Sequence, residues 1–119
     1  MRSVPILAVL LLAAATPALA QSSCVEPSAP APVDRASVTP DQLRAAMAQA
    51  HDFIAQSSVY QQCLLKEVEA AKTQATTSGQ PFEPMIETSA LYKIETSKKA
   101  QQKVGAAAND ALTAYKSPR

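Results

Sequence analysis

The sequence predicts an all-α protein: one long antiparallel two-helix hairpin, coiled-coil-like, preceded by a proline-rich extended arm. Alanine is the most frequent residue, glycine occurs only twice, and aromatic residues make up 4% of the chain. A β-sandwich needs frequent turn residues and strands rich in β-branched and aromatic side chains, which this composition does not supply. Apolar residues instead recur at three- and four-residue intervals in two long segments, the spacing of helices that bury one side.

The first twenty residues have the pattern of a secretory signal peptide. Arg2 supplies a positive charge, residues 4–15 are almost uninterruptedly apolar, and Ala18-Leu19-Ala20 forms a small-x-small cleavage site. A membrane anchor is the first alternative, but a spanning helix needs about 20 apolar residues and two prolines interrupt this run. We therefore predict a signal peptide over 1–20, a periplasmic or secreted location, and no integral membrane segment after cleavage.

A lipoprotein is the second alternative, because Cys24 lies close behind the cleavage site. Lipidation requires small and aliphatic residues directly before the cysteine, whereas Gln21-Ser22-Ser23 stand there. The sequence therefore favours a chain without a lipid anchor.

The mature chain opens with a proline-rich arm over 21–38, followed by a helical hairpin over 39–117. The first helix, expected over about 40–77, has a complete start signal: Thr39 as N-cap, Pro40 at the first helical position, and Gln42 closing a capping box. Val38 and Leu43 have the spacing of a hydrophobic staple across that start. Gly79 then suits the end of the helix, since glycine favours the left-handed conformation there.

The second helix is expected over about 84–116 after a turn at 78–83, with Pro81 as a competing start. If the chain folds back near Gly79, the numbers of facing residues add up to a constant. When this sum is 158, apolar positions of one helix face apolar positions of the other. The facing pairs are then Val68 with Ala90, Leu64 with Ile94, Ile54 with Val104, Ala50 with Ala108, Met47 with Ala111, and Leu43 with Tyr115.

The same register places polar residues opposite each other in the middle of the hairpin. It pairs Gln61 with Ser97 and Ser57 with Gln101. A shifted register would leave such groups buried without partners at about 1–3 kcal/mol each, so a matched polar layer can fix the alignment. A wet and weakly packed layer is the alternative. Gly105 lies among alanines, and we interpret it as a close-packing position rather than a hinge.

Two cysteines, Cys24 and Cys63, predict a disulfide in an exported protein. An arm of polyproline geometry extending back from Thr39 is long enough to reach Cys63. The sequence favours an intramolecular bond, with an intermolecular bond and a reduced pair as alternatives. No C-x-x-C motif supports a redox activity.

No residue pattern indicates catalysis, a cofactor or a metal. His51 is the only histidine and has no ligand-type residue one helical turn away, so we expect a solvated surface residue. Glu67 and Glu69 cannot share a helix face, and no second acid forms a catalytic pair with either. The balanced charge gives no electrostatic footprint for nucleic acid.

One cluster of charge stands out on the second helix: Lys93, Lys98, Lys99 and Lys103. Such a run is usually a solvated helix face, and the alternative is contact with an anionic partner such as a lipid headgroup. Four large apolar residues fall off the main stripe, namely Val59, Leu65, Leu91 and Leu112. Such residues are commonly scattered over a protein surface. The alternative is a second contact surface, used by the arm, by an unknown protein partner or by a second copy in a homodimer.

Three stretches carry a resemblance: Thr39-Pro40-Asp41-Gln42-Leu43, Phe53-Ile54-Ala55 and Tyr60-Gln61-Gln62-Cys63-Leu64. Together with the signal peptide and the Cys-bearing arm, they resemble small uncharacterised exported helical proteins of Gram-negative bacteria. The resemblance covers the arm and the first helix, and it implies an address in the cell envelope. It supplies no activity or ligand, so the favoured function is a non-enzymatic interaction or structural hairpin. The alternative is binding of a membrane surface or anionic ligand through the lysines.

Overall fold

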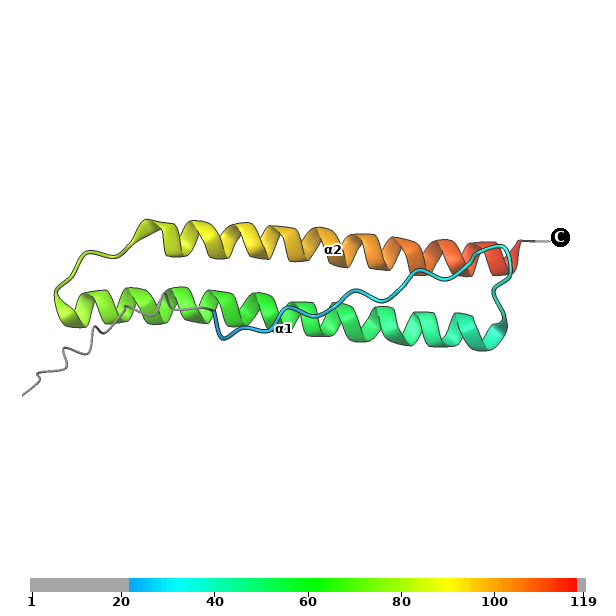
Figure 1. Ribbon diagram of the computed structural model, residues 1–119, viewed down its shortest axis with the longest axis horizontal. Coiled ribbons are helices and arrows are strands. Elements are labelled where there is room, and N and C mark those ends of the chain that lie inside the picture. Colours follow the sequence, from blue (N-terminus) through cyan, green and yellow to red (C-terminus); the bar gives the residue numbers. More distant parts are fainter. Residues whose placement is uncertain (1–21, 118–119) are drawn as a thin grey trace, which may run out of the picture.

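The computed structural model describes residues 22–117, and the predicted signal peptide lies outside these residues. Two helices, α1 (Pro40–Ser78) and α2 (Pro84–Lys116), lie side by side in opposite directions, and no strand occurs in the described part. Figure 1 shows residues 22–39 running without helical structure along this pair, toward the end opposite the α1–α2 turn. The predicted all-α hairpin is confirmed.

The start of α1 has the predicted cap. The Thr39 side chain accepts a hydrogen bond from the Gln42 amide at 3.2 Å, and the Thr39 amide donates to Gln42 Oε1 at 2.9 Å. Val38 and Leu43 are both buried in one cluster, as the hydrophobic staple requires. These local interactions fix where the arm ends and the helix begins.

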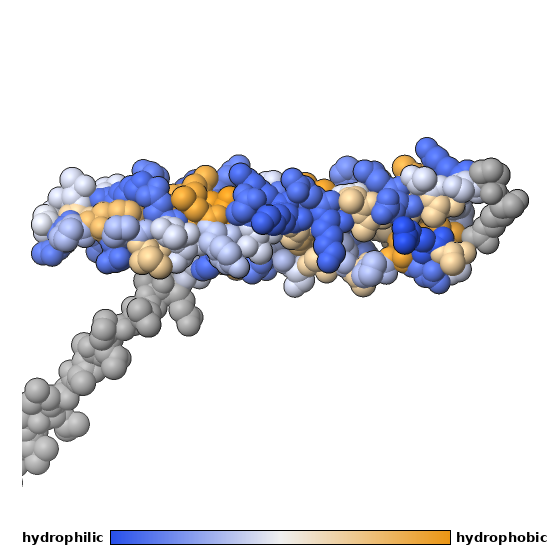
Figure 2. Space-filling view, turned by 90° about the horizontal axis from the view of Figure 1, so that it is seen from above, coloured by the Kyte–Doolittle hydropathy of each residue, from blue (hydrophilic) through white to orange (hydrophobic). Residues whose placement is uncertain are grey.

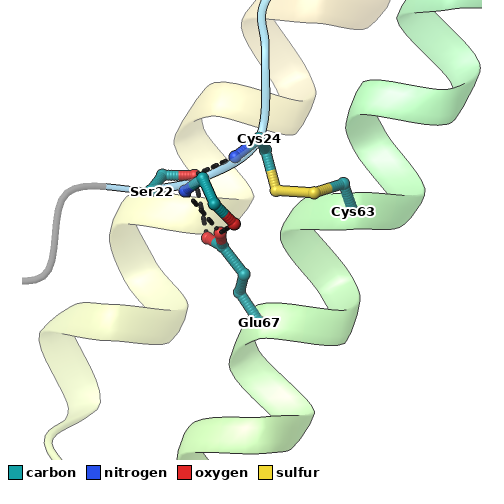
Figure 3. The surroundings of a disulfide bond; sticks show 5 residues. Ser22, Cys24, Cys63 and Glu67 are labelled. Carbon is teal, nitrogen blue, oxygen red and sulfur yellow. Dashed lines mark hydrogen bonds between the residues drawn. A yellow bond between two sulfur atoms is a disulfide. The ribbon is translucent and has the colours of Figure 1, made fainter.

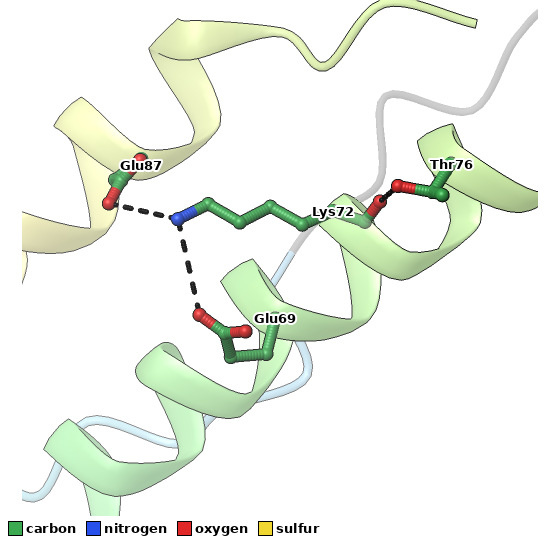
Figure 4. A network of polar contacts seen from close by, with 4 residues as sticks. All are labelled: Glu69, Lys72, Thr76 and Glu87. Atoms are coloured by element: carbon green, nitrogen blue, oxygen red, sulfur yellow. Dashed lines mark hydrogen bonds and ion pairs between the residues drawn. The ribbon is translucent and has the colours of Figure 1, made fainter. Parts of the chain in front are cut away.

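The turn between the helices is held by backbone geometry and by one lysine. Gly79 has a φ of 67°, and its amide together with that of Gln80 satisfies the last carbonyls of α1. Lys72 Nζ donates to Glu87 Oε1 of α2 at 3.2 Å and lies 4.0 Å from Glu69 Oε1 (Figure 4). The same ammonium lies 5.6 Å from the centre of the Phe82 ring. The chain therefore reverses at Gly79, as predicted, and the Lys72–Glu87 ion pair connects the two helices beside the turn.

The core follows the predicted register. Leu64 shares a cluster with Ile94, and Ile54 packs against the cluster that contains Val104. One predicted pair is wrong: Tyr115 is 45% exposed, and Leu43 is covered by Val38 and Ala111 instead. The arm returns over Leu43 at this end, so the tyrosine is not needed there.

The buried side of α1 is displaced from the predicted stripe toward the arm. Phe53 and Tyr60, which the stripe omits, are 5% and 6% exposed, whereas Ile54 and Gln61 are only half-buried. A two-helix hairpin buries one stripe on each helix. Here the arm covers a second side of α1, so the residues between helix and arm are buried as well.

The central polar layer forms with one of the two predicted pairs, and the other pair has different partners. Gln61 Nε2 donates to Ser97 Oγ and to Gln101 Oε1, both at 3.0 Å, so the Gln61–Ser97 pair is as predicted. Gln101 Nε2 donates to Ser58 Oγ and the Ile54 carbonyl rather than to Ser57. The Ser57 hydroxyl is fully buried and has no hydrogen-bond partner. The layer is thus a network of direct hydrogen bonds between the helices, in which the Ser57 hydroxyl has no partner among the described residues.

Gly105 is not the tight packing position that the alanine-rich sequence predicts. A Cβ added to Gly105 would meet only Ile54 Cδ1, at 3.9 Å, which is an ordinary van der Waals contact. The close approach of the helices therefore does not depend on this glycine.

Candidate functional site

A disulfide joins the arm to the middle of α1. Cys24 and Cys63 are 39 residues apart in sequence, and their Cα atoms lie 5.7 Å apart. The bond is intramolecular, as the length of the arm predicts, and the described residues include no free cysteine. The disulfide and the capped start of α1 therefore attach the arm at both ends.

Beside the disulfide, Glu67 receives the first residues of the arm (Figure 3). Glu67 lies one helical turn after Cys63, so both side chains point to the same side of α1. The Ser22 hydroxyl donates to Glu67 Oε2 at 2.8 Å, and the Ser23 amide and hydroxyl donate to Oε1 at 2.8 and 2.9 Å. We call Ser22, Ser23, Cys24, Cys63 and Glu67 the clasp.

The clasp shifts the protonation of two groups. Burial raises the pKa of Glu67, but the hydrogen bonds from Ser22, Ser23 and Cys24 outweigh it and hold this pKa below its usual value. Burial, aided by the negative charges of Glu26 and Glu67, raises the pKa of the Tyr60 hydroxyl. At neutral pH the clasp therefore contains a carboxylate that accepts several hydrogen bonds beside a neutral tyrosine.

Only one group in the described part of the chain brings three potential metal ligands together, and it belongs to the clasp. Ligand atoms of Cys24, Cys63 and Glu67 lie within 4.8 Å of one another. Metal binding by cysteine requires the thiolate, and both sulfur atoms are bonded to each other here. In the oxidised protein the group holds the arm and offers a metal only one carboxylate.

The four lysines that cluster in the sequence lie on the surface of α2. Lys93, Lys98, Lys99 and Lys103, which we call the lysine face, are all exposed. None of them takes part in the ion pairs formed among residues 22–117. His51 is also exposed, as expected.

Large apolar side chains remain uncovered away from the arm. Leu65 of α1 and Leu91 of α2 are 49% and 53% exposed, and Val59 is 67% exposed. Figure 2 looks onto α2 and shows a mostly hydrophilic surface with short hydrophobic patches between the charged side chains.

The sequence did not indicate the role of Glu67. Its signal was the four-residue spacing from Cys63 together with two serines directly before Cys24. That pattern acquires meaning only once the disulfide places the serines over the helix.

Comparison with known proteins finds no matching family model, no similar curated protein and no similar solved structure. Neither described helix combines the length and the hydropathy that crossing a bilayer requires.

Proposed function

We propose that this protein is exported and acts without catalysis, as a structural or interaction hairpin in the periplasm or outside the cell. The observation that carries the proposal is the Cys24–Cys63 disulfide, since such bonds persist in oxidising compartments and are rare in the cytosol. The predicted signal peptide over 1–20 agrees with that location.

Export is tested by expressing the full chain with a C-terminal tag in a Gram-negative host. We expect a product shortened by the signal peptide, found in the periplasm or medium, whose cysteines do not react with a maleimide until a reductant is added. A full-length cytoplasmic product with two reactive thiols would contradict the proposal.

The interaction role is supported by the exposed apolar residues Leu65 and Leu91, whose burial by a partner or by a second copy would be favourable. Light scattering over a concentration series tests self-association, and crosslinking in the envelope fraction tests other partners. We expect Leu65→Glu with Leu91→Glu to abolish the complex, while Gln62→Glu, at an exposed position of α1, leaves it intact. A complex that survives the leucine changes would remove this surface from the proposal.

A second candidate is binding of an anionic surface, favoured by the four exposed lysines, which form no ion pair with any residue of 22–117. Flotation with vesicles of anionic lipid tests it, with zwitterionic vesicles as control. Binding at low salt should disappear when Lys93, Lys98, Lys99 and Lys103 are all changed to Gln, and should persist in Lys66→Gln on α1. Absence of flotation with anionic vesicles at low salt would exclude this candidate.

A further inference from the structure

Between the arm and the hairpin lies a partly enclosed cavity of about 270 Å³. Its walls come from three segments: residues 29–33 of the arm, 46–50 of α1 and 100–108 of α2. Almost all lining residues are alanine, valine or proline, and only Gln49 and Lys103 contribute polar side chains. The short side chains explain the space, because neither the alanines of the helices nor the Ala-Pro sequence of the arm reaches across the groove.

The part of the arm that covers this cavity is held less firmly than its ends. Cys24 is bonded to Cys63, and Val38 is buried against Leu43. Among the described residues, no hydrogen bond involves the segment 25–33, whereas the residues on both sides of it are hydrogen-bonded. The middle of the arm is therefore a strap held over the hairpin by apolar packing, such as that of Val33, and by its two attached ends.

The chemistry of the lining specifies an occupant. An apolar cavity takes an apolar group, and the lining extends along α2 from Ala100 to Ala108, a length of about 12 Å at 1.5 Å per residue. Lys103 lines the cavity while remaining exposed and without an ion pair, which places its charge at the rim. A ligand with a linear alkyl chain in the cavity and an anionic group at Lys103 would match both the apolar lining and the positive charge at the rim.

We propose that this arm cavity binds a free fatty acid of medium length, with the alkyl chain under the arm and the carboxylate at Lys103. The inference goes beyond the structural role proposed above and does not depend on it. It differs also from adsorption on an anionic surface, in which the four lysines act together and no cavity is needed.

The size of the cavity sets the length of chain that fits. An apolar cavity of about 150 Å³ accommodates benzene, so the arm cavity has room for a somewhat larger apolar group. Each buried methylene group strengthens binding by about fourfold. Affinity should therefore rise steeply with chain length and then level off once the cavity is full.

The experiment titrates the mature, oxidised protein by calorimetry with a series of saturated carboxylates from hexanoate to palmitate, each below its micelle concentration. We expect saturable one-to-one binding with a rise of about fourfold per methylene and a plateau at medium length. The matching alkanols should bind about two- to fivefold more weakly, since they lack the charge for an exposed ion pair. Absence of saturable binding, or a rise without a plateau, would overturn the proposal.

Two matched pairs of variants locate the site. Lys103→Gln should reduce carboxylate binding to the level of the alkanol, while Lys99→Gln, on the same helix but outside the cavity, should have no effect. Ala46→Leu should fill the cavity and weaken the longest chains at least tenfold, while Ala45→Leu, outside the cavity, should not. Circular dichroism checks that each variant is folded. Equal effects within either pair would show that binding occurs elsewhere, whether or not the anionic-surface candidate holds.

Discussion

The two halves of the hairpin are built differently. In the turn half, large side chains of Tyr60, Leu64 and Ile94 pack together, and the disulfide and the Lys72–Glu87 ion pair lie close by. In the open half, Phe53 and Leu43 pack mainly against alanine and valine, and the arm covers the groove without filling it. The difference indicates that the turn half should contribute more to the free energy of unfolding, while the apolar arm cavity lies in the open half.

The largest expected loss of stability comes from removing the disulfide of the turn half. Changing both cysteines to serine removes a link that closes a loop of 39 residues, which should lower the free energy of unfolding by about 4 kcal/mol. Urea denaturation of the double variant and of the oxidised protein measures this difference.

The two helices should still pair in the double-serine variant, because their contacts do not include the bond. A helical content by circular dichroism equal to that of the oxidised protein is expected in the absence of urea. An unchanged urea midpoint would show that the bond does not restrain the unfolded chain.

The next effect concerns large side chains in the turn half. Leu64 is 2% exposed, so Leu64→Ala should lower the free energy of unfolding by about 3 kcal/mol. Leu43→Ala in the open half should have a smaller effect, about 2 kcal/mol, because Leu43 is 8% exposed and its cluster contains only two other buried residues, Val38 and Ala111. Leu65 is next to Leu64 in sequence but 49% exposed, so Leu65→Ala is the matched control. It should lower the free energy of unfolding by less than about 1 kcal/mol. Urea midpoints that ranked Leu43 above Leu64 would reverse the comparison.

Two serine substitutions in the polar layer between the two halves should change the free energy of unfolding by smaller amounts and in opposite directions. Ser57→Ala removes a buried hydroxyl without a partner and should raise the free energy of unfolding by about 0.5–1 kcal/mol. Ser97→Ala removes the acceptor of a Gln61 hydrogen bond and should lower it by about 1 kcal/mol. The same denaturation measurement checks both, and a loss of stability in Ser57→Ala would mean that this hydroxyl has a partner in solution.

The smallest effect is the pH dependence of the clasp. The folded protein holds the pKa of Glu67 below the value of about 4.3 found in unfolded chains. The contribution of the clasp to the free energy of unfolding is therefore fully present above that pH. It is lost as the pH falls through the lower pKa of Glu67 in the folded protein. Hydrogen exchange of the Ser23 amide, corrected for intrinsic pH dependence, should accelerate over this acid range and should be already fast in Glu67→Gln. Protection that is the same in both proteins at every pH would contradict the assignment.

Features set by neighbouring residues could be predicted from the sequence. The Thr39–Gln42 capping box, the reversal at Gly79 and the Leu64–Ile94 register each follow from short-range chemistry or from helical spacing. Features that depend on the arm could not, because residues 22–38 have no periodicity that says which side of the hairpin they cover. For that reason the burial of Phe53 and Tyr60 and the partners of Glu67 emerged only with the structure.

Methyl–methyl nuclear Overhauser effects in the oxidised protein test the antiparallel register most directly. We predict cross-peaks between Leu64 and Ile94 and between Ile54 and Val104, all arising within one chain in a sample that mixes labelled and unlabelled protein. Absence of both cross-peaks, or their appearance only between chains, would contradict the hairpin on which the clasp, the arm cavity and the comparison of the two halves depend.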